Sequence, residues 1–155
     1  MEERSHVERL LVNYKTLEHF KKFKKYAIQE LSMLEDLEQN IVENNSESPF
    51  YGIYDGNLLV ARMSLYRIEK KFDRFFDSPQ DHLELSKLEV LPPYRNRGYG
   101  KSLVEYAKSF HLPIKTKAMR GSNAFWEKLG FKAVPGESEN IYVWYPSETN
   151  QHHVH

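Results

Sequence analysis

The chain has 155 residues, enough for one domain that buries a hydrophobic core without disulfides or metals. Its 22 basic and 22 acidic residues give zero net charge, so it lacks the basic excess that a dedicated nucleic-acid or membrane-surface binder needs. The absence of cysteine excludes disulfides, thiolate metal ligands and any mechanism that passes through an acyl-cysteine.

The N-terminal third predicts a strand followed by helices. The first residues do not resemble a signal peptide, and no apolar run is long enough to span a bilayer, so we expect a cytoplasmic protein. Residues 7–14 predict the strand, and apolar residues at helical spacing then continue to about Val42. The polar run 44–48 and Pro49 predict a loop.

The middle of the chain predicts a hairpin, a further strand and a helix. Residues 50–54 and 58–68 read as strands around Asp55-Gly56, a dipeptide typical of tight turns. Residues 82–91 predict another strand, which Pro92-Pro93 ends. The helix that follows a glycine loop has four residues on its expected core face: Leu103, Val104, Ala107 and Phe110.

The C-terminal part predicts a strand at 113–117, a helix at 122–129 and a closing pair of strands at 131–134 and 141–145. This order favours an α/β (α+β) fold in which helices flank a mixed sheet. We expect one domain over residues 1–146 and a frayed tail at 147–155, whose histidines we do not expect to hold a metal.

The segment 88–102 is the most informative, because a strand ends there, the chain turns through glycines and a helix begins. Free N–H groups at a helix N-terminus, together with the helix dipole, form a site suited to phosphates. Gly98 and Gly100 remove Cβ atoms and let the backbone approach a ligand. Three basic side chains add positive charge: Arg95, Arg97 and Lys101.

Three phosphate-binding patterns compete for this loop. Gly100-Lys101-Ser102 resembles the end of the nucleotide-triphosphate loop G-x-x-x-x-G-K-[ST], but Arg95 stands where that pattern needs its first glycine. The dinucleotide fingerprint G-x-G-x-x-G fails at Leu103. The pattern [QR]-x-x-G-x-[GA] matches from Arg95 to Gly100.

This third pattern resembles the loop of the GNAT acetyltransferase superfamily, and the segment Phe125-Trp126-Glu127-Lys128-Leu129-Gly130-Phe131 resembles that family's second signature, F-Y-x-K-x-G-F. The resemblance covers roughly residues 50–145. It implies the GNAT fold with a splayed central strand pair, and transfer of acetyl from acetyl-CoA to an amine without a metal. It implies these coenzyme-binding residues: Leu88, Glu89, Val90, Arg95, Asn96, Arg97, Gly98, Tyr99, Gly100, Lys101, Ser102, Asn123 and Trp126.

The resemblance also suggests where the chemistry takes place. A backbone N–H of the splayed strand, at Leu88 or Val90, would stabilise the oxyanion. Glu84 lies eleven residues before Arg95, the offset of the catalytic glutamate in histone acetyltransferases of this superfamily. We expect Glu84, partly buried on the face of Leu88 and Val90, to act as the base through a water; the alternative is an ordinary exposed strand residue.

The sequence departs from the family at the proton donor to the leaving thiolate. Trp126 replaces the usual tyrosine, and indole is not a practical acid. Met119 stands where the family has an asparagine, which Asn123 could replace. Tyr142 and Tyr145 are alternative donors, and a relatively acidic thiol needs no dedicated acid.

The segment 70–76 is longer than a turn needs and carries three phenylalanines. It predicts either a short helix that closes over the core or an overhang that lines an acceptor or partner site. Two rival functions remain open: a CoA- or acyl-CoA-binding module with little catalysis, and an interaction protein, with a homodimer through these phenylalanines as one form. The expected partners are acetyl-CoA and an amine of unknown class, with neither nucleic acid nor membrane.

Overall fold

The computed structural model describes residues 6–10, 16, 18–19 and 48–146. The predicted helices up to residue 42 and the tail at 147–155 lie outside these residues. The chain forms two compact units. Unit 1 contains Met1–Leu65 and Lys87–Tyr106, and unit 2 contains Tyr66–Ser86 and Ala107–His155. The expectation of a single domain over 1–146 stays a prediction.

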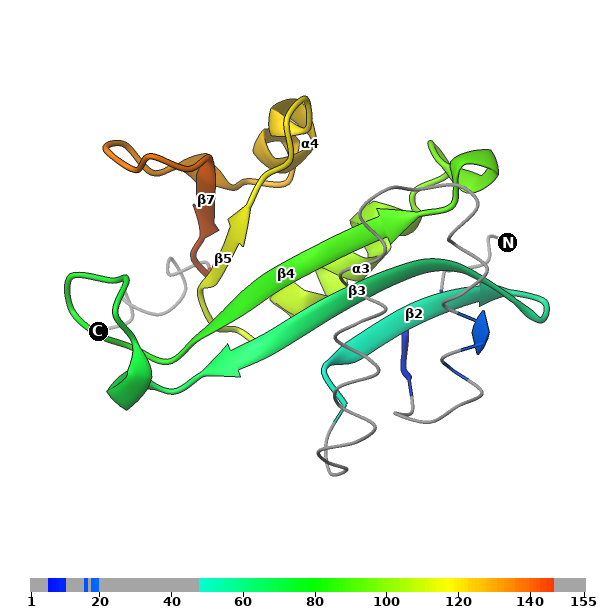
Figure 1. The fold of residues 1–155 in the computed structure, drawn as a ribbon, viewed down its shortest axis with the longest axis horizontal. Coiled ribbons are helices and arrows are strands. Elements are labelled where there is room, and N and C mark those ends of the chain that lie inside the picture. Colours follow the sequence, from blue (N-terminus) through cyan, green and yellow to red (C-terminus); the bar gives the residue numbers. More distant parts are fainter. Residues whose placement is uncertain (1–5, 11–15, 17, 20–47, 147–155) are drawn as a thin grey trace, which may run out of the picture. The chain divides into compact units, whose positions relative to one another are not determined.

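The described elements follow the predicted order (Figure 1). In chain order they are β1 (Glu8–Arg9), β2 (Phe50–Asp55), β3 (Leu58–Ile68), the 3-10 helix η2 (Lys70–Phe72), β4 (His82–Val90), the 3-10 helix η3 (Pro92–Tyr94), α3 (Tyr99–Lys108), β5 (Ile114–Lys117), α4 (Asn123–Lys128), β6 (Lys132–Ala133) and β7 (Ile141–Trp144). Most predicted bounds differ from these by one or two residues.

The strands form a mixed sheet in the order β1-β2-β3-β4-β5-β7-β6. β4 and β5 are parallel, whereas β1 with β2, β2 with β3, β5 with β7 and β6 with β7 are antiparallel. The predicted mixed, mostly antiparallel sheet with helices is confirmed. None of the helices in the described part of the chain has the length and apolar character to cross a membrane.

In unit 1, β2 and β3 form the predicted hairpin. Asp55 pairs with Leu58, so Gly56 and Asn57 make the turn, one residue later than predicted. Gly56 has a φ of 67°, a left-handed conformation that glycine adopts without strain. Every residue of β3 from Leu59 to Leu65 is buried, as expected for a strand covered on both faces.

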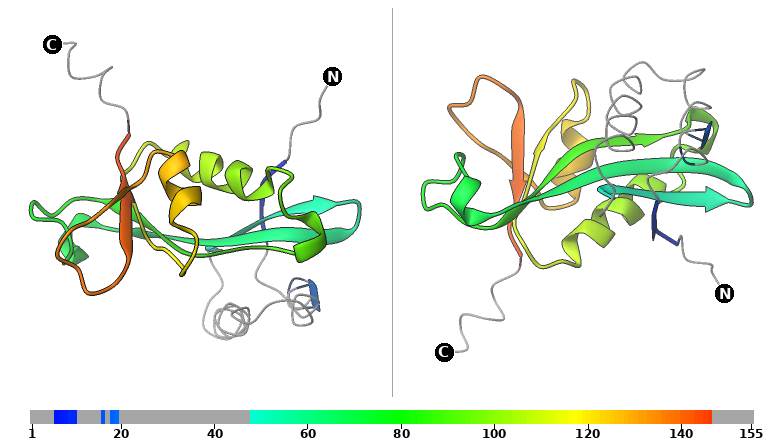
Figure 2. Two further views of the ribbon diagram at one scale, coloured as in Figure 1. Left: turned by 90° about the horizontal axis from the view of Figure 1, so that it is seen from above. Right: turned by 60° about the horizontal axis from the view of Figure 1, so that its bottom comes forward.

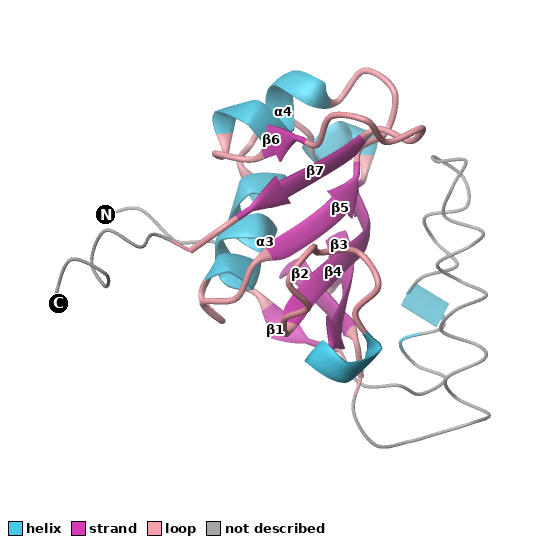
Figure 3. Cartoon of the chain, turned by 90° about the vertical axis from the view of Figure 1, so that its left-hand side faces the viewer, coloured by secondary structure: helices cyan, strands magenta, loops and turns pink. Residues whose placement is uncertain are grey.

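Helix α3 lies along one face of the strands of unit 1 (Figures 2 and 3). The Tyr106 ring on this helix lies 5.3 Å from the Tyr51 ring of β2, measured between centroids. Leu103 and Val104 are fully buried, as predicted. Phe110, predicted on the same core face, is 42% exposed. That prediction is wrong because the helix ends at Lys108, so helical spacing no longer places the next side chains.

In unit 2, β5 pairs with β4 and β7, and β6 continues the sheet beyond β7. Helix α4 turns Trp126 into the core, where its ring lies 5.0 Å from that of Phe131. Lys108 crosses to this region: its ammonium donates to the Leu129 carbonyl at 2.6 Å and lies 5.1 Å from the centroid of the Trp144 ring.

Candidate active site

The glycine loop of unit 1 connects η3 to α3 and supplies unpaired backbone donors. The first intrahelical bond is donated by the Ser102 N–H to the Gly98 carbonyl at 3.0 Å. The preceding amides of the helix, those of Tyr99, Gly100 and Lys101, lie in the first turn, where N–H groups have no intrahelical acceptor. These amides lie at the positive end of the helix dipole, where the sequence predicts an anion site; anion binding here stays a prediction.

Two left-handed residues shape this loop. Gly98 has a φ of 88°, and a Cβ added there would meet no atom within 4 Å. Glycine is therefore required by backbone conformation and not by lack of space. Asn96 has a φ of 65°, which asparagine tolerates better than most residues. Together they direct the chain from η3 into the first turn of α3.

The three basic side chains of the loop are exposed but have different surroundings. Arg95 Nε donates to the Val90 carbonyl at 3.0 Å, so this side chain ties the loop to the end of β4. The Arg97 guanidinium lies 5.1 Å from the centroid of the Tyr94 ring. Arg97 and Lys101 are therefore the side chains best placed to add positive charge beside a bound phosphate.

Glu89 was predicted as a coenzyme-binding residue, and its side chain is committed elsewhere in unit 1. Its carboxylate accepts from Arg62 Nη2 at 2.6 Å and from Arg62 Nε at 3.2 Å. The Arg62 side chain is fully buried and that of Glu89 is 6% exposed. Only the backbone of Glu89 is left for a ligand. Strand alternation predicted that Glu89 and Glu84 lie on opposite faces of the same strand. No sequence signal identified Arg62 as the partner of Glu89.

Leu88 and Val90, the predicted oxyanion donors, are half-buried residues near the end of β4. The register of β4 with β5 runs from Leu83–Ile114 to Leu85–Thr116, and β4 continues to Val90. Leu88 and Val90 thus come after Leu85, the last residue of β4 that pairs with β5, as expected for the predicted splayed strand. A strand edge of this kind can pair with an extended ligand arm.

Glu84, the predicted base, belongs to the β4 segment in unit 2 and is half-buried. Its register partner on β5 is Lys115, whose ammonium lies 4.7 Å from the centroid of the Phe75 ring. Within the described ranges, no residue forms a hydrogen bond or ion pair with the Glu84 carboxylate. A half-buried carboxylate without a protein partner is available to hold a water or an amine.

The predicted residues of α4 also belong to unit 2. Asn123 is exposed, and its Oδ1 accepts from Asn140 Nδ2 at 2.8 Å, so its own amide group remains available. Trp126 is 5% exposed, with its ring 4.9 Å from that of Phe125. Its role against the pantetheine arm stays a prediction, as does that of Asn123.

The two tyrosines suggested as proton donors differ. The Tyr142 hydroxyl is buried and donates to the Glu127 carboxylate at 2.9 Å. Burial, and then the bond to Glu127 and its charge, raise the pKa of Tyr142 above its usual value, which makes the phenol a weaker acid. Tyr142 is therefore poorly suited to protonate a thiolate. Tyr145, by contrast, is 55% exposed, and its ring lies 6.1 Å from that of Phe76.

Among the described residues, no group of three or more histidine, aspartate or glutamate side chains could hold a metal ion.

Comparison with known proteins identifies the family. The sequence profile described as "Acetyltransferase (GNAT) family" matches residues 13–131. The uncharacterised N-acetyltransferase YlbP of Bacillus subtilis is 61% identical over 145 residues, which cover 90% of this chain and 91% of YlbP. The uncharacterised N-acetyltransferase BH2580 of Halalkalibacterium halodurans is also 61% identical over 145 residues, covering 90% of this chain and 86% of the relative.

Solved structures agree. The crystal structure of B. subtilis YlbP in complex with coenzyme A matches with a TM-score of 0.74 at 59% identity, covering 92% of this chain and 97% of that one. The PaiA N-acetyltransferase of Thermoplasma acidophilum, at 14% identity and a TM-score of 0.62, supports the fold alone. The chain therefore belongs to the GNAT family of acetyltransferases, which are enzymes of the acyltransferase class.

Proposed function

We propose that this protein is an N-acetyltransferase that binds acetyl-CoA and transfers its acetyl group directly to a primary amine. The observation that carries the proposal is the loop before α3, where left-handed Gly98 precedes first-turn amides beside Arg97 and Lys101. These groups fit a pyrophosphate, because each offers N–H donors or positive charge. The coenzyme A in the crystal structure of YlbP, a relative of 59% identity, supports the same ligand here.

In the proposed reaction the amine nitrogen attacks the thioester carbonyl, the carbon–sulfur bond breaks and coenzyme A leaves as a thiolate. A backbone N–H at Leu88 or Val90 donates to the developing oxyanion. Glu84 receives the proton that the amine loses, through a water held against its partnerless carboxylate. The chain has no cysteine, so the acetyl group passes without an acyl-cysteine.

The loop is tested by titrating coenzyme A into the protein and into the variants Gly98→Val and Arg97→Ala. In Gly98→Val the β-branched residue is strained at φ 88°, so affinity for coenzyme A should fall. In Arg97→Ala the loss of one charged contact should weaken the affinity by about tenfold. Lys132→Ala, an exposed change on β6, is the matched control for Arg97→Ala and should leave affinity unchanged. No binding at millimolar coenzyme A would contradict the proposal.

The base is tested with Glu84→Gln, which keeps the size of the side chain. With an accepted amine and saturating acetyl-CoA, kcat at pH 7 should fall by roughly a hundredfold or more, while coenzyme A affinity is retained. An active enzyme indifferent to this change would remove the assignment of Glu84 but leave the transferase function. A kinetically competent acetylated enzyme would contradict direct transfer.

A specific observation favours a second function, a CoA- or acyl-CoA-binding module with little catalysis. Trp126 stands where the family has its tyrosine and is buried, and the raised pKa of Tyr142 makes it a poor acid. Measuring coenzyme A release over a panel of polyamines, amino acids and peptides separates the two functions. If none of these amines causes coenzyme A release although coenzyme A binds tightly, the module is favoured. The variant Trp126→Tyr then tests whether a phenol restores transfer.

Two expectations about the cell and the assembly stay predictions. A cytoplasmic location rests on the sequence alone. The homodimer through the phenylalanines of 70–76 rests mainly on Phe72, which is 63% exposed, because Phe75 and Phe76 are half-buried. Sedimentation of the protein and of Phe72→Ser tests that dimer.

A further inference from the structure

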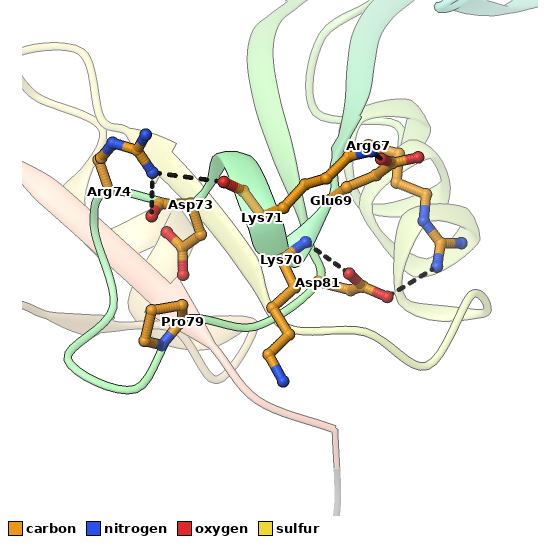
Figure 4. A pocket seen from close by; sticks show the side chains of 8 residues that line it. All are labelled: Arg67, Glu69, Lys70, Lys71, Asp73, Arg74, Pro79 and Asp81. Atoms are coloured by element: carbon orange, nitrogen blue, oxygen red, sulfur yellow. Dashed lines mark hydrogen bonds and ion pairs between the residues drawn. The ribbon is translucent and has the colours of Figure 1, made fainter.

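The connection between β3 and β4 forms a charged depression in unit 2, separate from the residues proposed above for coenzyme binding (Figure 4). Its volume is about 730 Å³, and it is open to solvent. Eight residues line it: Arg67, Glu69, Lys70, Lys71, Asp73, Arg74, Pro79 and Asp81. The sequence predicted either a helix over the core or an overhang here; the structure has the 3-10 helix η2 followed by this depression.

Asp73 holds the connection in shape. Its buried carboxylate accepts N–H bonds from Phe75 at 2.8 Å, Gln80 at 3.0 Å and Phe76 at 3.3 Å. Burial by itself would raise the pKa of Asp73, but these N–H groups, with nearby His82, hold it below its usual value. The side chain is inaccessible, so its negative charge serves the framework and not a ligand.

An aromatic cluster supports the same framework. The Phe76 ring lies 4.9 Å from the rings of both Phe75 and buried His82, measured between centroids. The ring contact with Tyr145, at 6.1 Å, extends the cluster beyond β7. These ring contacts and the Asp73 hydrogen bonds therefore hold the backbone that forms the depression.

Both acidic side chains on its rim already have partners. Asp81 accepts from the Lys70 backbone N–H at 2.6 Å and from Arg67 Nη2 at 3.2 Å. Glu69 lies 3.8 Å from the Lys71 ammonium. These pairs engage both rim carboxylates directly, and the Lys70 ammonium acts on Asp81 through its charge without a direct ion pair.

The other two cationic side chains that line the depression are Lys70 and Arg74, which are exposed. Arg74 Nη1 donates to the carbonyls of Asp73 at 3.2 Å and Lys71 at 3.4 Å, which hold the guanidinium in place while its other N–H groups stay free. Within the part of the chain that the structure describes, the Lys70 ammonium binds no carboxylate. The held guanidinium of Arg74 and the exposed ammonium of Lys70 point in different directions in Figure 4, so each can bind a different carboxylate of one ligand.

We propose that this depression docks a short acidic segment of a partner protein, whose carboxylates bind Lys70 and Arg74. Phe72, 63% exposed on the same 3-10 helix, offers contact to an apolar residue of that segment. The depression is lined by charges of both signs, which suits the separate carboxylates of a peptide better than the continuous charge of nucleic acid or an anionic membrane. An open depression also suits an extended chain better than a small enclosed ion. This inference does not depend on acetyl transfer.

The test is fluorescence anisotropy of the full chain with a labelled, N-acetylated peptide of glutamates around a single leucine. The blocked terminus keeps the peptide from acting as an amine acceptor, so binding is read without catalysis. We expect saturable binding that weakens as salt rises. The double variant Lys70→Glu, Arg74→Glu should weaken it by about tenfold.

The matched control is Arg120→Glu, Lys132→Glu, which makes the same charge change at two exposed residues outside the depression. Its affinity should stay within about twofold of the parent. The milder pair Lys70→Gln, Arg74→Gln, with coenzyme A binding as a check on folding, replaces the reversal if that variant unfolds. The proposal is overturned if the peptide does not bind, or if replacing its glutamates by glutamines leaves the affinity unchanged. It is also overturned if the two glutamate variants lose affinity equally. A third contrary result is that inorganic phosphate or an oligonucleotide displaces the labelled peptide as well as the unlabelled peptide does.

Discussion

Two arginine–carboxylate pairs in different parts of this protein have opposite surroundings. In unit 1, Arg62 and Glu89 approach to 2.6 Å with side chains 0% and 6% exposed. In unit 2, Arg67 and Asp81 approach to 3.2 Å with side chains 58% and 43% exposed. Both pairs join a guanidinium to a carboxylate, and the side chains differ strongly in burial.

The difference separates charges that hold the structure from charges that water can replace. Removing one member of a buried pair leaves the other charged, dehydrated and uncompensated. Removing one member of an exposed pair returns the other to water and costs little. The rim of the 69–81 connection belongs to the second kind, which is why charge reversal there tests binding without unfolding the chain.

The largest effect is expected for Glu89→Ala. It removes the carboxylate that pairs with the buried Arg62 guanidinium and should lower the free energy of unfolding by about 3–5 kcal/mol. Urea denaturation measures the loss. Glu84→Ala, on the same strand but half-buried and without a protein partner, is the matched control and should cost about 1 kcal/mol or less. Equal losses for the two glutamates would break the comparison. Replacing Arg62 and Glu89 together by methionine should cost less than Glu89→Ala alone.

An intermediate effect is expected at Asp73, a buried carboxylate held by backbone amides. Its folded pKa lies below its unfolded value of about 3.9. Its contribution is therefore complete above the unfolded pKa and is lost as the pH falls through the folded one. Hydrogen exchange at the Phe75, Phe76 and Gln80 amides should be protected at neutral pH and lose protection in acid. In Asp73→Asn these amides should lack this acid-dependent step, and an unchanged profile would contradict the assignment.

The smallest effect is expected for Arg67→Ala. The exposed pair with Asp81 is screened by water and salt, so the free energy of unfolding should change by about 0–1 kcal/mol. Thermal unfolding at low and high salt measures it, and the difference from the parent should shrink at high salt. A loss as large as that of Glu89→Ala would show that exposure does not set the weight of these pairs.

Local patterns predicted most of the fold. The alternation and turn chemistry of residues 50–68 predicted the hairpin, because a two-residue turn requires left-handed backbone, which Gly56 supplies. The prolines after β4 and the glycines before α3 marked the loop in the same way. Phe110 failed because periodicity cannot tell on which residue a helix ends.

In the candidate site, too, local patterns predicted the backbone but not the contacts of the side chains. The spacing from Arg95 to Gly100 predicted an anion-binding loop, since backbone conformation there depends on which residues are glycine. Together with the second signature at Phe125 to Phe131, it predicted the family. The partners of side chains came only from the tertiary structure: Arg62 for Glu89, and Glu127 for the Tyr142 hydroxyl. Such contacts join residues far apart in the chain, and neither periodicity nor turn chemistry encodes which strand or helix lies opposite. The sequence therefore determined the backbone of the glycine loop, and tertiary packing decided which charged side chains are paired within the protein.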